Sequence, residues 1–147
     1  MSSVDQAVKG VSLAVDETVQ SLNLQVQSRA RRAVQIMYNK AQDVLAGQRN
    51  GRRYKMPFKN VTYQASAPGE PPAARTGNLR RNWQLDVIGK RKGKGVLVTC
   101  RLTSKMDYSV WLDGGSPGGK LKPRPYVEKI RKAAMQEIQQ IYSEPLI

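Results

Sequence analysis

The stretch from Val4 to Val44, VDQAVKGVSLAVDETVQSLNLQVQSRARRAVQIMYNKAQDV, decides the fold of this chain. Its apolar residues recur at spacings of three and four, which is the period of an α-helix. The stripe consists of Val4, Val8, Val11, Val15, Val19, Leu22, Val26, Ala30, Ala33, Met37, Ala41 and Val44. These spacings match a nearly straight helix, and Gly47 is placed to end it. The sequence therefore predicts one long helix over residues 1–46.

Such a helix is long for a chain of 147 residues. At ~1.5 Å per residue it would reach roughly 60 Å, which is more than the width of a domain of this size. Either the helix breaks, at Gly10 or near residues 21–23, or part of it packs on another subunit. A core helix with a frayed start and a helix shared with a neighbouring subunit of a ring are equally open at this point.

Residues 47–82 differ in kind from the helix, because they are polar, basic and interrupted by proline and glycine. This composition predicts an extended arm, with a short strand around Tyr54 to Phe58. Pro68, Pro71 and Pro72 hold such an arm extended at low entropic cost, and Gly69 allows a turn. The arm either closes on its own domain as a surface loop or wraps a neighbouring subunit.

Residues 83–112 carry the alternating pattern of β-strands. Trp83, Leu85 and Val87 alternate with polar residues, and the stretch from Val96 to Leu102 does the same. The intervening GKRKGKG, residues 89–95, predicts an antiparallel hairpin with a mobile basic tip. A third strand is expected over Tyr108 to Leu112. Trp83 and Trp111 are expected to anchor the core because both lie in apolar-patterned strands.

The end of the chain returns to the helical period. A glycine-rich loop over residues 113–123 precedes Pro123 and Pro125, which open a helix over residues 124–142. Its apolar stripe consists of Val127, Ile130, Ala134, Ile138 and Ile141. The sequence thus predicts a single α+β domain over residues 1–147, with a long N-terminal helix, a small antiparallel β-sheet carrying a long extended arm, and a C-terminal helix packed on the sheet.

The charge of the chain is strongly basic and unevenly placed. With 25 Lys and Arg against 11 Asp and Glu, the formal net charge is +14. Residues 47–132 hold 20 of the basic and 5 of the acidic side chains. Basic residues interleaved with glycine suit contact with phosphates without sequence readout. The candidate DNA-channel residues are Lys90, Arg91, Lys92 and Lys94. A solubilising face, or a contact with acidic partner proteins, carries about equal weight.

The residues that most chemistry needs are scarce. The chain has no histidine, and its one cysteine, Cys100, alternates with apolar neighbours, which indicates a small core residue. Its carboxylates are scattered along the sequence rather than clustered. We therefore expect no catalytic residue, no metal and no cofactor, and hence no enzyme. The absence of a long apolar run predicts neither an export signal nor a membrane span.

Three ordered motifs are more specific than composition. They are SAPGEPPA at residues 66–73 followed by TGNLR at 76–80, DYSVWLDGG at 107–115, and RPYV at 124–127, with GRRY at 51–54 leading into the first. Together they closely resemble the signature of small neck, or tail-completion, proteins of long-tailed double-stranded DNA bacteriophages.

The resemblance implies a structural virion protein without enzymatic activity. Such a protein forms a ring at the head–tail junction, caps the tail tube, joins it to the head and lines the DNA channel. Six copies are favoured and twelve are the alternative. The implied partners are a head-closure or adaptor ring, a tail-tube or tail-terminator protein, and double-stranded DNA, with no membrane. The implied location is the virion, and the host cytoplasm during assembly. The alternative is a sequence-independent nucleic-acid-binding protein.

Two further groups of candidate residues belong to this reading of the motifs. The candidates for subunit contact by the arm are Pro68, Gly69, Glu70, Pro71, Pro72, Leu79 and Arg80. The candidates for a docking loop are Asp113, Gly114, Gly115 and Arg124.

Overall fold

The computed structural model describes residues 2–146, and its longest element is the helix α1, Ser3–Ala46. Ser2 and Asp5 form a reciprocal capping box at its start, and Gly47 follows its end. The predicted helix is confirmed. The alternative of a break is wrong, because the helix runs without interruption through Gly10 and residues 21–23. Gly10 has no neighbouring atoms within 4 Å of the place of a side chain, so nothing packs there to bend the helix.

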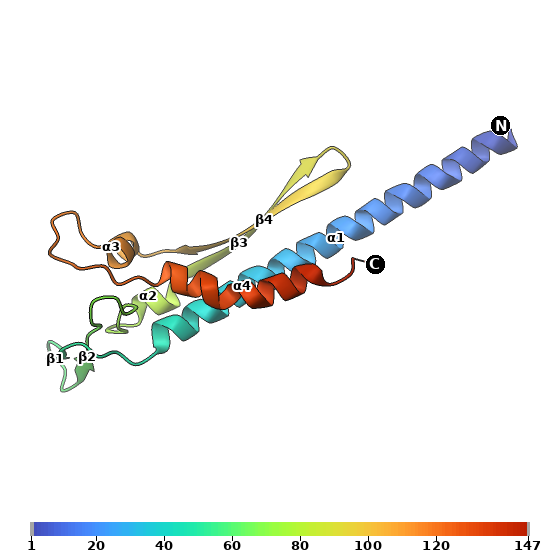
Figure 1. The fold of residues 1–147 in the computed structure, drawn as a ribbon. Coiled ribbons are helices and arrows are strands. Elements are labelled where there is room, and N and C mark those ends of the chain that lie inside the picture. Colours follow the sequence, from blue (N-terminus) through green and yellow to red (C-terminus); the bar gives the residue numbers. More distant parts are fainter. Residues whose placement is uncertain (1, 147) are drawn as a thin grey trace.

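Burial divides α1 into two parts. Residues 3–18 are all exposed, whereas the buried side chains begin at Arg29 and continue to Leu45. Figure 1 shows the first part of α1 extending well beyond the rest of the molecule. The stripe that was read from the sequence is thus continuous, but only its C-terminal part is covered by this chain.

A long hairpin packs on α1. Its strands are β3, Trp83–Lys92, and β4, Gly95–Ser104, paired antiparallel so that Trp83 lies opposite Ser104 and Val87 opposite Cys100. The half-buried residues of β4 alternate with exposed ones, as the sequence predicts. Cys100 is half-buried on this apolar face rather than enclosed in the core.

The hairpin tip is shorter than expected. The turn consists of Gly93 and Lys94 alone, with Gly93 in the left-handed region at φ 64°, and the basic run before it belongs to β3. Successive side chains of a strand point to opposite faces. Lys90 and Lys92 therefore lie on one face of the hairpin and Arg91 on the other, so they do not form one mobile basic loop.

The third strand expected at Tyr108–Leu112 is wrong. The chain forms the short helix α3, Ser109–Gly114, in which the amide of Leu112 donates to the carbonyl of Tyr108. In a stretch of five residues, apolar residues at the first, third and fifth positions fit a strand, and the first and fifth also fit one face of a helix. The sequence of residues 108–112 therefore does not separate the two. As a result Trp111 is 54% exposed and anchors no core, whereas Trp83 packs against the core as expected.

The arm contains small elements of its own. Strand β1, Arg53–Lys55, pairs antiparallel with β2, Thr62–Gln64, and the helix α2, Asn78–Arg81, precedes β3. The strand expected around Tyr54 to Phe58 is present but ends at Lys55. Phe58 has φ 61°, a left-handed backbone conformation that is incompatible with a β-strand.

The last helix, α4, Val127–Ser143, packs on α1 and the sheet. Its start lies three residues after the predicted boundary. Arg29 donates to the carbonyls of Tyr142 and Glu144, and Arg32 makes two hydrogen bonds, of 2.8 and 2.9 Å, to the Glu144 carboxylate. Arg29 of α1 thus binds carbonyls at the end of α4, and Arg32 binds the carboxylate of the residue that follows it.

The core lies where α1, α2 and α4 meet. Its buried residues are Ala41, Leu45, Leu79, Tyr126 and Ile130. The fold is α+β, with a long N-terminal helix, two small antiparallel sheets and a C-terminal helix packed on the sheet, which confirms the predicted class. Within residues 2–146 no helix is both long enough and apolar enough to cross a lipid bilayer.

Candidate functional site

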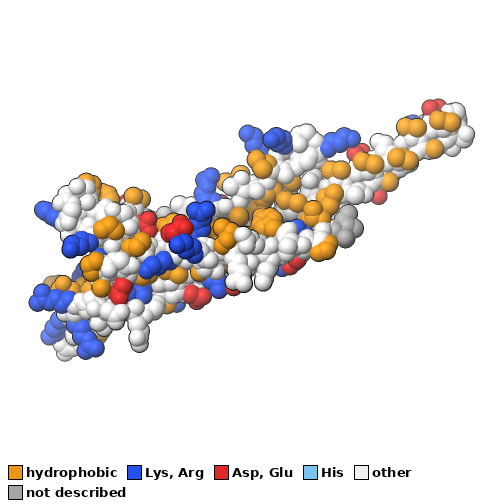
Figure 2. Space-filling model, in the orientation of Figure 1, with side chains coloured by type: hydrophobic (Ala, Val, Ile, Leu, Met, Phe, Trp, Pro, Cys, Tyr) orange, Lys and Arg blue, Asp and Glu red, His pale blue; other side chains and the backbone are white. Residues whose placement is uncertain are grey.

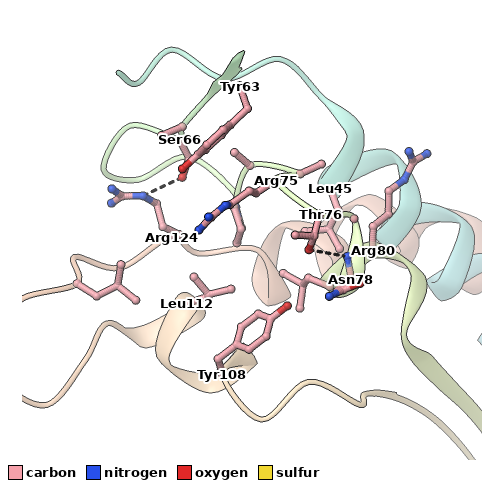
Figure 3. A pocket seen from close by; sticks show the side chains of 17 residues that line it. Leu45, Tyr63, Ser66, Arg75, Thr76, Asn78, Arg80, Tyr108, Leu112 and Arg124 are labelled. Atoms are coloured by element: carbon pink, nitrogen blue, oxygen red, sulfur yellow. Dashed lines mark hydrogen bonds between the residues drawn. The ribbon is translucent and has the colours of Figure 1, made fainter. Parts of the chain in front are cut away.

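The three sequence motifs meet around one cavity of about 610 Å³ (Figure 3). Residues from α1, the arm, α2, α3 and the glycine-rich loop contribute to its wall. The lining includes Leu45, Tyr63, Ser66, Pro72, Arg75, Thr76, Asn78, Leu79, Arg80, Tyr108, Leu112, Leu121 and Arg124. Segments that are far apart in the sequence, from residue 63 to residue 124, therefore form one site.

The PGE sequence of the first motif builds a tight turn. The amide of Glu70 donates to the Ala67 carbonyl at 3.0 Å, with Pro68 and Gly69 between them and Gly69 at φ 86°. These are the residues that a type II turn requires at its two central positions. A side chain other than glycine would be strained there.

Glu70 also fixes this turn through its side chain. Its carboxylate accepts hydrogen bonds from the backbone amides of Asn50, at 3.0 Å, and Ala67, at 2.8 Å, and from Asn50 Nδ2 at 2.7 Å. These donors hold the pKa of Glu70 below its usual value, with the Asn50 amide contributing most. The charged carboxylate ties this turn to Asn50, near the start of the arm.

The arm lies against its own chain. Buried Arg49 donates from Nε and Nη2 to the Pro72 carbonyl, both at 3.2 Å, and from Nη2 to the Val44 carbonyl at 2.8 Å. Burial lowers the pKa of Arg49 from its ordinary value. Lys129 of α4 donates to the Gly69 carbonyl at 2.9 Å. Of the two arrangements open from the sequence, the structure has the arm closed on its own domain.

The remaining arm candidates are placed in two ways. Pro72 and Leu79 are buried, and Leu79 belongs to the core. Arg80 is exposed at the rim of the cavity, where Figure 3 shows its guanidinium directed away from the centre. Pro72 and Leu79 therefore contribute to folding, and whether the arm also contacts a neighbour stays a prediction.

The docking-loop candidates connect α3 to α4. Asp113 Oδ1 accepts from the amides of Tyr126, at 3.0 Å, and Val127, at 3.1 Å, and so caps the start of α4 from a distance in sequence. Gly114 ends α3 and Gly115, at φ 83°, leaves room for Leu121 and Pro123 close by. Their observed contacts are within the chain.

Arg124 joins the loop to the arm. Its Nε donates to Ser66 Oγ at 2.9 Å, and its amide donates to the Leu112 carbonyl at 2.7 Å. Residues of all three motifs are thus joined by hydrogen bonds, and residues of all three line the cavity.

The cavity carries positive charge. Arg75, Arg80 and Arg124 line it, although the Arg80 guanidinium is directed away from its centre, and none of the described acidic side chains lines it. The Arg75 guanidinium lies 5.7 Å from the centre of the Tyr63 ring, a cation–π contact that holds it at the wall. Arginine guanidinium groups bind carboxylates or phosphates through paired hydrogen bonds. The site is therefore suited to an anionic group of a partner.

The sequence did not single out every residue of this site. Arg49, Tyr63 and Arg75 were not candidates, because nothing in their local pattern distinguishes them from other basic or aromatic residues of the arm. Only their positions in the sequence could have identified two of them. Arg49 follows the predicted helix end at Gly47, and Arg75 lies between two of the motif segments.

The DNA-channel candidates lie apart from this cavity, at the free end of the hairpin. Figure 2 shows Lys and Arg side chains at that end of the molecule. Lys94 Nζ is 3.7 Å from the Asp16 carboxylate, and the Lys94 carbonyl accepts from Asn23 at 3.5 Å, so the tip rests beside α1. All four candidates are exposed.

Within residues 2–146, no three His, Cys, Asp or Glu side chains are grouped in a way that would hold a metal ion. Comparisons of the chain with protein-family models, with curated proteins and with solved structures give no match.

Proposed function

We propose that this chain is a structural subunit of a ring at the head–tail junction of a long-tailed double-stranded DNA bacteriophage. The ring caps the tail tube, joins it to the head and lines the channel through which the genome passes. Six copies are favoured, and twelve are the alternative. Its neighbours are a head-closure or adaptor ring on one side and a tail-tube or tail-terminator protein on the other.

The observation that carries the proposal is the uncovered part of α1. A regular helix stretch with an apolar stripe, exposed over residues 3–18, gains little from its own chain. Such a stripe is stabilised when another molecule covers it. A closed ring supplies that cover in every copy, because each subunit offers the same surfaces to the next.

The motifs and the charge support the same function. The motif residues resembling phage neck proteins are gathered around one cavity, whose arginines suit an acidic surface of a neighbouring protein. The exposed basic hairpin suits contact with DNA phosphates of any sequence. Both features suit a ring subunit that binds neighbouring proteins and surrounds the DNA passing through the channel.

The second candidate is a sequence-independent nucleic-acid-binding protein. The net charge of +14 favours it, since a monomer with this charge would bind DNA by counterion release alone. The two functions differ in what the isolated protein does. A monomer that binds DNA tightly favours the second, and a ring whose separate subunits bind weakly favours the first.

The test is a phage genome in which the coding sequence of this chain is interrupted. We expect the infected cell to accumulate DNA-filled heads and separate tails, visible by electron microscopy, with joined particles restored by the intact chain supplied in trans. Normal joined virions that lack the chain would contradict the proposal.

A further inference from the structure

An apolar groove lies between the hairpin and α4. It has a volume of about 880 Å³, and Met37 of α1 and Trp83 lie along it. Figure 2 shows hydrophobic side chains gathered between the hairpin and the last helix. The apolar residues along its two sides include Cys100, Leu102, Val127, Ala134, Met135 and Ile138. Met135 and Val127 are exposed in this chain, so the groove is open.

The groove also contains an unpaired polar atom. Trp83 Nε1 is buried and has no hydrogen-bond acceptor among the described residues. A buried donor without an acceptor costs free energy, on the order of 1–3 kcal/mol. Because Nε1 is enclosed, an occupant of the groove would bind through the apolar walls alone.

The same chain carries an apolar surface that fits this groove in kind and size. Val4, Val8, Val11 and Val15 are 68, 62, 65 and 48% exposed, and they lie on one side of a regular helix. Residues 3–18 span about 24 Å at the α-helical rise, and the 17 residues of α4 that form one wall span about 26 Å. Amphipathic helices bind in grooves of this type by their apolar face.

Charge distinguishes the two surfaces. Residues 2–18 hold three acidic side chains, Asp5, Asp16 and Glu17, and a single basic one, in a chain whose net charge is +14. Arg101 and Arg131 line the groove together with one acidic residue, Asp113, so the groove is net basic. The helix stretch and the groove are therefore of opposite sign, which favours their contact over contact of two grooves.

The helix cannot fill the groove of its own chain, because α1 is continuous and its first part points away from the body (Figure 1). We propose that residues 3–18 of one copy lie in the groove between β4 and α4 of the next copy. This contact joins two different surfaces, so it repeats from subunit to subunit, and it forms a ring when the rotation between successive copies closes. It deepens the proposed function, because it rests on the ring and names the contact that forms it.

Cys100 provides a direct test, because the chain's one cysteine lines the groove. Val8→Cys, Val11→Cys and Val15→Cys each place a second thiol on the stripe. Under mild oxidation of the full-length protein, we expect at least one of them to form an intermolecular disulfide with Cys100, which mass spectrometry of the peptides identifies. The linked species should extend beyond dimers, because each copy offers one helix and one groove.

Matched variants make the result specific. Leu13→Cys, on the opposite side of α1 and 62% exposed, should form no such disulfide, and adding Cys100→Ser to Val11→Cys should abolish the linked species. Far-ultraviolet circular dichroism checks that each variant is folded.

The remaining outcomes overturn the inference in distinguishable ways. A ring in which no stripe cysteine reaches Cys100 refutes the contact and leaves the proposed function standing. Linkage between two stripe cysteines that stops at dimers and persists with Cys100→Ser shows that the stripe pairs with itself. A monomer at all accessible concentrations refutes both the contact and the ring.

Discussion

Glu70 and Asp113 show why the motif residues are acidic in a basic chain. Each carboxylate accepts backbone amides from a distant part of the chain, Glu70 from Asn50 and Asp113 from Tyr126. The sequence predicted both as contact residues, one for a neighbouring subunit and one for a docking loop. The proline–glycine pair before Glu70 indicates a turn, but nothing in the pattern identifies which distant amides a carboxylate will meet, because that depends on the tertiary fold.

Replacing Glu70 with glutamine tests its role in the arm. The folded state holds the pKa of Glu70 below its unfolded value, so the carboxylate contributes stability that is present above the unfolded pKa and lost as pH falls through the folded pKa. We expect Glu70→Gln to lower Tm at about pH 7 and the difference from the unaltered protein to vanish near pH 2. The control is Asp107→Asn, at an exposed position, and an equal Tm loss at both pH values would refute this role.

Removing the Asp113 carboxylate tests the cap on α4. Asp113→Ala leaves the amides of Tyr126 and Val127 without their acceptor and should lower the free energy of unfolding by about 1 kcal/mol. Asp113→Asn keeps a side-chain oxygen and should cost less. Denaturant unfolding measures both, and equal losses would mean that the charge matters rather than the hydrogen bonds.

At the scale of elements, sequence patterns were most informative where they were long. The apolar period of α1 runs through the whole helix, and the two strands of the hairpin pair as predicted. Burial alternates along β4 as expected, but it does not along β3, where Leu85 is 37% exposed. The five residues from Tyr108 to Leu112 carry too little pattern to separate strand from helix. The choice is made by tertiary contacts, since Leu112 packs against the core from α3.

The stability of the core below the cavity is expected to depend on one residue of α2, Leu79. Leu79 is 9% exposed and contacts the cluster of α1 and α4 residues. Leu79→Ala should lower the free energy of unfolding by about 2–5 kcal/mol, because it removes buried methyl groups and leaves a cavity. Chemical denaturation measures the loss, and Leu97→Ala, at an exposed leucine of β4, should cost far less. A cost equal to that of the control would show that α2 is not part of the cooperative core.

The basic end of the hairpin separates a DNA-contact role from a solubility role. Replacing Lys90, Arg91, Lys92 and Lys94 together with glutamine should leave the fold intact, because all four are exposed. If they face DNA, the slope of log affinity against log salt should fall by up to about 0.9 for each charge that contacts a phosphate. Unchanged DNA affinity of the assembled protein, with full infectivity of the virions, would assign the charge to solubility or to acidic neighbours.

On the scale of the whole molecule, the main feature is that the chain leaves two apolar surfaces exposed. The first part of α1 and the groove beside α4 are both apolar and both uncovered, although they belong to the same 147 residues. The sequence indicated a helix too long for its domain, and it left a frayed start and a contact with a neighbouring subunit equally open. It gave no sign of the groove, because that surface is formed by β4, α3 and α4 only after they have packed on α1.

The central claim is that the protein forms a closed ring through the exposed stripe of α1. Native mass spectrometry of the full-length protein measures this most directly, compared with Val8→Glu/Val11→Glu and with the control Gln6→Glu/Leu13→Glu, which adds the same charge on the opposite side of the helix. We predict one discrete ring, of six or twelve copies, for the unaltered chain and the control, and monomers for the stripe variant. A monomeric unaltered chain, or a ring that survives the stripe substitutions, would contradict the account.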